Sequence, residues 1–199
     1  MSNLERLWQI FKAAYGETGA AALLGNIRAE SAYNPQNLQN SYEKKLGFTD
    51  ATYTAAVDSG AYPREKFEKD SAGYGLCQWT HWSRKRNLYN YVKNLAGSIG
   101  DLDCQANFCI FEIGAYGLSS LLSGSASLRD KTAAILRQYE KPADQSDANV
   151  DRRTRYAEEI LAQFKSVPVS SPKYAAIAEE LRAEADRLRA LADKIEMEV

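Results

Sequence analysis

The chain has 199 residues and a formal net charge of −1, with 45% hydrophobic and 26% charged residues. A near-neutral charge argues against a protein that binds nucleic acid through bulk charge. No stretch approaches the roughly 20 apolar residues that cross a membrane, and the opening MSNLERLWQIF lacks the pattern of a signal peptide. We therefore expect a globular protein without a membrane span, which needs another route if it acts outside a cell.

The first part of the chain predicts two consecutive helices. Apolar residues recur at helical spacing over residues 3–15, and Gly16 suits the end of this helix. Thr18 suits the cap of a second helix, which runs through GAAALLGNIRAES. The dipeptide Asn34-Pro35 then stops helical structure.

The fold class follows from what comes next. Residues 34–72 lack helical periodicity over most of their length and contain many glycines, prolines and tyrosines, so we expect short strands and one brief helix around TDATYTAAVDSG. Helical patterns return after GYGLCQWT and continue to residue 165. The prediction is an α+β fold, predominantly helical, with two lobes and a small irregular or β lobe inserted early.

The C-terminal part differs in kind. SVPVSSP, residues 166–172, has the composition of a linker. Residues 173–199 carry an apolar heptad seam that Glu184 interrupts, which predicts an amphipathic helix. This helix would self-associate, pack on a partner, or fold back on the domain formed by residues 1–165.

Glu30 is the first candidate for chemistry. It follows Leu23 and Ile27 at spacings of four and three, so it lies on the apolar stripe of its helix. Burial and the negative end of the helix both disfavour a carboxylate there, and Arg28 points elsewhere. These influences favour the protonated form that a general acid needs. The alternative is a glutamate at the edge of the stripe with its tip in water.

A second stretch, FEKDSAGYGLCQWT, ends the irregular lobe. Gly73-Tyr74-Gly75 permits a tight turn, and Gln78 and Trp79 offer an amide and an indole face that suit a sugar. A glycine-rich turn before a buried strand would have the same composition, so this stretch alone does not decide.

Together, ESAYNP and GYGLCQW resemble lysozymes and lytic transglycosylases, in which a helix-ending Glu-Ser faces a Gly-Leu-x-Gln segment across the cleft. The resemblance is strongest to the phage tail lysozyme family and covers residues 3–165. Further segments carry it: GNIRAES, YTAAVDSG, FEKDSAGYGLCQWTHWSRKRNLY, DLDCQANF with Glu112, and YEKP followed by RRTRYA.

This resemblance implies a muramidase that cleaves the β-1,4 bond between N-acetylmuramic acid and N-acetylglucosamine in peptidoglycan. Glu30 matches the general acid, Ser31 a local hydrogen-bonding residue, and Gln78 the glutamine across the cleft. We expect the residues that contact substrate to be Ser31, Tyr33, Tyr74, Gln78, Trp79 and Tyr139.

The second carboxylate is where this chain departs from one known pattern. Animal c-type lysozymes have an aspartate before the Tyr-Gly of the matching segment, where this chain has Gly73. Asp70 is the candidate for a base or electrostatic stabiliser, and a turn-forming aspartate is the alternative. Lytic transglycosylases use one glutamate and leave an anhydro sugar, so that outcome stays open.

For Glu112 and for the basic cluster of residues 84–86, we expect structural roles. Glu112 lies within an apolar helix and is expected to pair with an arginine such as Arg137 or Arg155, and the alternative is that it is the catalytic acid. Arg84-Lys85-Arg86 is expected to form a solvated helical face.

The expected partners are peptidoglycan glycan strands, not nucleic acid or a membrane. No cofactor or metal is implied, because the three cysteines and single histidine lack the spacing of a metal site. The protein would act from a phage tail or after release to the cell wall, and the C-terminal helix would contact itself or a tail protein. An inactive peptidoglycan-binding or tail-assembly module is the rival, against which the presence of Glu30 argues.

Overall fold

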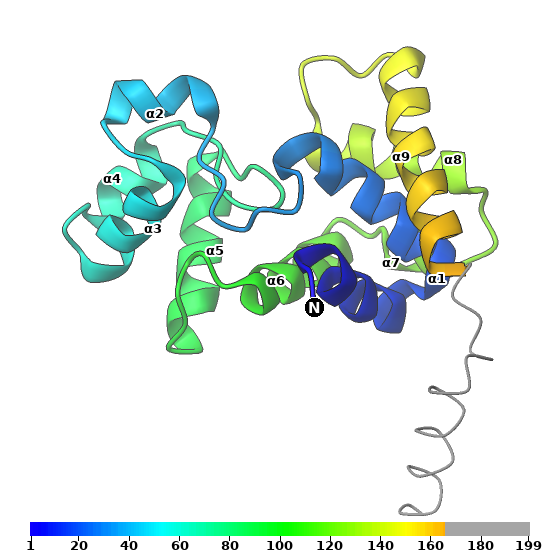
Figure 1. Cartoon of the computed structure of the whole chain (residues 1–199), viewed down its shortest axis with the longest axis horizontal. Helices are drawn as coiled ribbons and strands as arrows, with labels where there is room; N and C mark the ends of the chain where they lie inside the picture. Colours follow the sequence, from blue (N-terminus) through cyan, green and yellow to red (C-terminus); the bar gives the residue numbers. More distant parts are fainter. Residues whose placement is uncertain (166–199) are drawn as a thin grey trace, which may run out of the picture. The chain divides into compact units, whose positions relative to one another are not determined.

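The computed structural model describes residues 1–165, which are predominantly helical (Figure 1). The helices in chain order are α1 (Asn3–Ser31), α2 (Asn40–Leu46), α3 (Asp50–Ser59), α4 (Arg64–Lys69), α5 (Trp82–Asn94), α6 (Leu102–Ala115), α7 (Ser119–Ser123), α8 (Leu128–Ala134), the π-helical turn η1 (Ile135–Glu140) and α9 (Asp147–Lys165). The predicted linker, 166–172, and the predicted C-terminal helix, 173–199, lie outside the described residues.

Helix α1 carries the candidate acid in its last turn. Ser2 and Glu5 form a capping box that begins the helix. Gly16 breaks it with a φ of 71° and a ψ of 179°, which confirms the two predicted helical segments. The helix ends at Ala32 in the left-handed conformation, directly after Glu30 and Ser31.

The predicted β lobe is absent from the described residues, so the α+β assignment is wrong, while the predominantly helical character is confirmed. Residues 34–72 contain the three short helices α2, α3 and α4, and α3 is the brief helix that was expected. Strand-like pairing in residues 1–165 is limited to isolated bridges of Tyr74 with Leu38 and with Trp79.

Local capping and aromatic packing explain why helices replace the expected strands. Thr49 and Thr52 form a capping box that begins α3, and Gly47 and Gly60 end α2 and α3 in left-handed conformations. Aromatic rings then hold the short helices together, with centroids 5.4 to 6.1 Å apart. These rings belong to Phe48, Tyr53, Tyr62, Phe67 and Tyr74.

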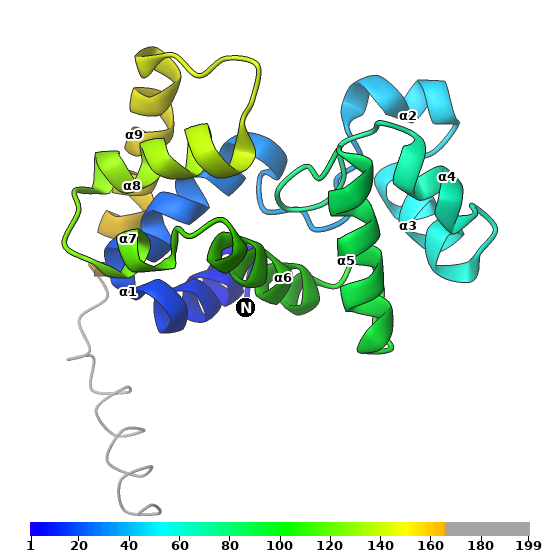
Figure 2. The same ribbon diagram turned by 180° about the vertical axis from the view of Figure 1, so that it is seen from behind.

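Residues 1–161 form one compact unit, and the second unit, 162–199, is described only as far as Lys165. Within the first unit, α1 packs against α6, α7 and α8, while α5 contacts α4 and α6. Figures 1 and 2 show α2, α3 and α4 on one side of α5, with α1 and α6 to α9 on the other. None of the helices in residues 1–165 is both long and apolar enough to cross a membrane.

Candidate active site

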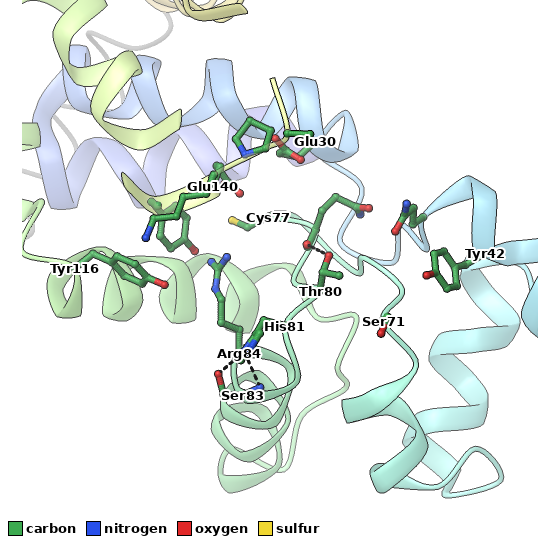
Figure 3. A pocket seen from close by; sticks show the side chains of 16 residues that line it. Glu30, Tyr42, Ser71, Cys77, Thr80, His81, Ser83, Arg84, Tyr116 and Glu140 are labelled. Atoms are coloured by element: carbon green, nitrogen blue, oxygen red, sulfur yellow. Dashed lines mark hydrogen bonds between the residues drawn. The ribbon is translucent and has the colours of Figure 1, made fainter. Parts of the chain in front are cut away.

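A cavity of about 1010 Å³ lies between the end of α1, the segment that leads into α5, and the end of η1 (Figure 3). Three of the predicted site residues, Glu30, Gln78 and Tyr139, line it together. Arg84 and Glu140 also line it, and sequence reasoning assigned neither of them to the site. Residues far apart in the chain therefore meet at one hollow.

Glu30 faces this cavity with a side chain that is 17% exposed. Its Oε1 atom lies 2.6 Å from Nη2 of Arg153, which comes from α9. Arg28 instead pairs with Glu159, as expected from its direction on the helix. A cation from a distant helix, Arg153, therefore pairs with Glu30, which the neighbouring sequence of α1 did not reveal.

The Gly-Asn pair within GNIRAES explains how Arg153 reaches Glu30. A Cβ atom on Gly25 would lie 2.6 Å from the Arg153 carbonyl oxygen, so glycine lets α1 and α9 approach closely. Asn26, one turn before Glu30, accepts a hydrogen bond of 3.2 Å from Arg153 Nη1. Its own amide donates to the backbone oxygens of Ala22 and Thr132. Asn26 thus fixes the arginine from the face of α1 that also carries Glu30.

Glu140 is the second carboxyl group of the cavity. It ends the π-helical turn η1 and precedes Lys141, whose φ is 50°. Its Oε1 atom is buried, and no donor within residues 1–165 forms a hydrogen bond with it. Burial, followed by the charge of Glu30, raises the pKa of Glu140 to about 8, against the opposing effects of Arg84 and Arg153. π-Helical turns frequently occur at functional sites. In the sequence, the YEKP segment was the feature that could have pointed to Glu140.

Glu112 organises one wall of the cavity. Its carboxylate receives hydrogen bonds from Arg84, from the indole of Trp79 at 2.7 Å and from the hydroxyl of Tyr139 at 2.8 Å. Glu112 does pair with an arginine, but with Arg84 rather than with either arginine proposed from the sequence. With its charge neutralised in this way, Glu112 positions Arg84 and Tyr139 at the cavity.

Asp70 is not among the residues that line the cavity of Glu30. Its side chain is 3% exposed and lies 2.5 Å from Nζ of Lys85, which is fully buried. Tyr53 donates to the Asp70 carboxylate, and the Ala72 amide donates to it across a tight turn. This geometry matches the turn-forming alternative for Asp70 rather than a base acting at Glu30.

The basic cluster at the start of α5 does not form the expected solvated face. Arg84 pairs with Glu112, Lys85 with Asp70, and Arg86 with Glu68. Burial lowers the pKa of Lys85 more than Asp70 raises it. The periodicity of α5 did not reveal these partners because they come from α6, the end of α4 and the turn after it.

Four predicted substrate-binding residues are not brought to the cavity surface. Tyr74 and Trp79 are fully buried, and the Tyr74 hydroxyl forms a hydrogen bond with Thr54 at 2.7 Å. Ser31 donates to the Leu76 backbone oxygen at 2.9 Å. Tyr33 is also absent from the lining, and no group in residues 1–165 forms a hydrogen bond with its buried hydroxyl. None of these four side chains lines the cavity.

Gln78 faces the cavity in a constrained turn, with a φ of 44°. Its side-chain amide donates to Asn37 at 2.8 Å and to the Gly75 backbone oxygen at 3.1 Å. A neighbouring hollow of about 540 Å³ shares Ser71, Thr80 and His81 with the cavity and adds Trp82, which is 46% exposed. No three His, Cys, Asp or Glu side chains in residues 1–165 cluster in a way that could hold a metal ion.

Comparison with known families gives one finding that bears on this site. The model of the phage tail lysozyme family matches residues 2–164, which include every element that lines the cavity. No curated protein gives a match.

Proposed function

This chain belongs to the phage tail lysozyme family, and we propose that it is a muramidase with Glu30 as general acid. Family membership implies a peptidoglycan-degrading, lysozyme-like activity and association with a phage tail. The proposal adds the bond, which is the β-1,4 linkage between N-acetylmuramic acid and N-acetylglucosamine. It rests on one observation above all: Glu30 lines a large cavity with Gln78 and Tyr139 at the end of a helix.

The surroundings of the cavity support a polymeric substrate. The neighbouring hollow shares three lining residues with it, so a glycan strand can extend from one into the other. There the exposed ring of Trp82 offers an apolar face for a sugar. We propose that several sugar units bind along this path, with the reacting bond at Glu30.

In the proposed reaction, Glu30 gives its proton to the glycosidic oxygen as the bond to C1 of muramic acid breaks. The transition state gathers positive charge on the sugar ring. Water then adds its hydroxide to C1 and returns a proton to the site, which leaves a reducing muramic acid end. Asp70 takes no part in this scheme, because its carboxylate is buried against Lys85.

A lytic transglycosylase of the same site is the second candidate, and the position of Asp70 favours keeping it. With Asp70 outside the cavity lining, the site is consistent with a mechanism in which Glu30 acts without that aspartate. The substrate's own hydroxyl would then attack C1 and give an anhydromuramic product. An inactive binding or assembly module has less support, since the acid and a lined cavity are both present.

The test is mass spectrometry of muropeptides released from purified peptidoglycan by the wild-type protein and by Glu30→Gln. Glu159→Gln is the matched control, because Glu159 is an exposed glutamate that pairs with Arg28. We expect reducing muramic acid ends from the wild type and the control, and none from Glu30→Gln. Anhydromuramic ends would replace the hydrolase by the transglycosylase, and no soluble product from any protein would overturn both.

A further inference from the structure

Glu140 lies in the same cavity as Glu30, yet the proposed reaction gives it no role (Figure 3). Carboxyl groups inside proteins are normally satisfied by hydrogen bonds. The buried Oε1 atom of Glu140 receives none from residues 1–165, so hydrogen bonding within the described structure does not stabilise its charged form.

Charged groups from four helices act on Glu140. Glu30 of α1 and Glu112 of α6 disfavour its ionisation, while Arg84 of α5 and Arg153 of α9 favour it. Both arginines are already engaged with other carboxylates, Arg84 with Glu112 and Arg153 with Glu30. Each arginine near Glu140 is therefore paired with a different glutamate.

We propose that Glu30 and Glu140 share one proton near neutral pH, which Glu140 holds in the resting site and which Glu30 delivers to the glycosidic oxygen. The delivery rests on the proposed function, whereas the sharing is a property of the site that can be measured without substrate. Glu140 is then a positioning residue, because it acts through Glu30 rather than on the sugar.

The position of the proton follows from the contacts. Two carboxylates in one partly buried site do not ionise together readily, since each charge raises the proton affinity of the other. Nη2 of Arg153 lies 2.6 Å from Oε1 of Glu30, so the guanidinium charge acts most strongly on that carboxyl group. Glu140 has burial and the charge of Glu30 acting against its ionisation. The neutral form therefore resides on Glu140.

With the resting proton on Glu140, each proton used in a catalytic cycle is replaced by the end of that cycle. Glu140 transfers its proton to the carboxylate of Glu30 when substrate fills the cavity. Glu30 passes it to the glycosidic oxygen as the bond to C1 breaks, which leaves both glutamates ionised. The attacking water supplies hydroxide to C1 and one proton to the pair, and the resting state is restored.

Titration of carboxyl ¹³C signals by NMR tests the sharing directly. The wild-type protein should show one glutamate transition near neutral pH, and Glu140→Asp should identify it by moving it. In Glu30→Gln the transition of Glu140 should shift to lower pH by about 1 unit or more, because the neighbouring charge is gone. If Glu140 titrates with ordinary glutamates, or keeps the same transition in Glu30→Gln, the inference is overturned.

The pH dependence of kcat/KM on peptidoglycan tests the delivery. Glu140→Gln should lower the rate at neutral pH about 10-fold or more and move the basic limb to lower pH, whereas Glu140→Asp should keep the wild-type shape. Asp144→Asn, an exposed carboxylate in the following loop, should change neither. An unchanged profile in Glu140→Gln overturns the role of Glu140 while the muramidase stands. An inactive wild type that retains the NMR transition overturns the muramidase and leaves the shared proton intact.

Discussion

The Glu30–Glu140 cavity and the Asp70–Lys85 cluster are two regions in which a carboxylate is partly or fully buried beside a cation. In the cluster, Asp70 pairs with Lys85 and accepts hydrogen bonds from Tyr53 and the Ala72 amide. In the cavity, the Oε1 atom of Glu140 has no hydrogen-bond partner within residues 1–165. The two regions therefore differ in how fully their carboxylate oxygens are satisfied.

We propose that this difference separates a structural carboxylate, Asp70, from the carboxyl groups that take part in the reaction. A buried carboxylate that is paired and hydrogen-bonded stabilises the folded state only through those partners, and its protonation brings no benefit. A carboxylate that faces a cavity, and whose oxygen atoms have no hydrogen-bond partner in the protein, can still exchange protons and contact a ligand. Substitutions in the two regions should accordingly affect different quantities.

The largest effect is expected for Glu30→Gln, which should lower the rate of peptidoglycan cleavage by about 10² to 10⁴-fold. Its stability should fall, because buried Arg153 loses its charge partner, but the variant should still fold, since Asn26 continues to accept a hydrogen bond from Arg153. The rate is measured by release of muropeptides, and folding by far-UV circular dichroism. A variant that folds and keeps wild-type activity would show that the acid lies elsewhere.

Asp70→Asn should lower stability and leave the catalytic rate of the folded protein unchanged. The substitution leaves Lys85 buried without its charge partner, so the free energy of unfolding should fall by about 3–5 kcal/mol. Urea denaturation measures this loss. The folded fraction should keep wild-type kcat, and a large fall in kcat without loss of stability would return Asp70 to the reaction.

Asn26→Ala should have a smaller effect on both quantities, since Asn26 contacts Arg153 rather than the substrate. Losing its buried hydrogen bonds should cost about 1–3 kcal/mol in urea denaturation. The freed Arg153 should also lower kcat by roughly tenfold through misplacement of Glu30. Asn26→Asp, which keeps the oxygen that accepts from Arg153, should restore part of kcat, and failure to do so would count against the positioning role.

The last prediction concerns the pH dependence of stability. The pKa of Glu140 is raised from 4.5 to about 8 by burial and by Glu30, so the folded state binds more protons than the unfolded state between these values. Glu140 therefore makes stability fall as the pH rises from about 4.5 to about 8. Glu140→Gln should remove this loss, and at pH 9 it should raise Tm relative to the wild type. Parallel curves of Tm against pH for the two proteins would contradict it.

Much of the helical framework could be predicted from the sequence. Apolar residues at helical spacing identified both segments of α1, as well as α5, α6, α8 and α9, because each buries one face against its neighbours. The error concerned residues 34–72, where short capped helices held by aromatic rings leave no long periodic pattern. Local capping decided that region, and the high content of glycine and proline was taken for strands and loops.

Part of the candidate site could also be predicted from apolar residues at helical spacing. Glu30 was proposed because it lies on an apolar stripe. Arg153 has the same pattern, since it shares its stripe with Val150, Ala157 and Ile160. The apolar stripe of α9 therefore contains Arg153, the cation that pairs with Glu30. Glu140 also follows the apolar residue Leu136 at a spacing of four, but the sequence analysis did not assign it to the site.

The sequence by itself determined the family and most of the longer helices, and it proposed Glu30 at the end of α1 as the acid, because these inferences depend on local periodicity and on ordered motifs. Only the tertiary structure decided which charges meet. Glu30 with Arg153, Glu112 with Arg84, and Asp70 with Lys85 join segments that are far apart along the chain or lie on different helices. Charge pairing and desolvation depend on distances in space, and helical periodicity carries no information about them.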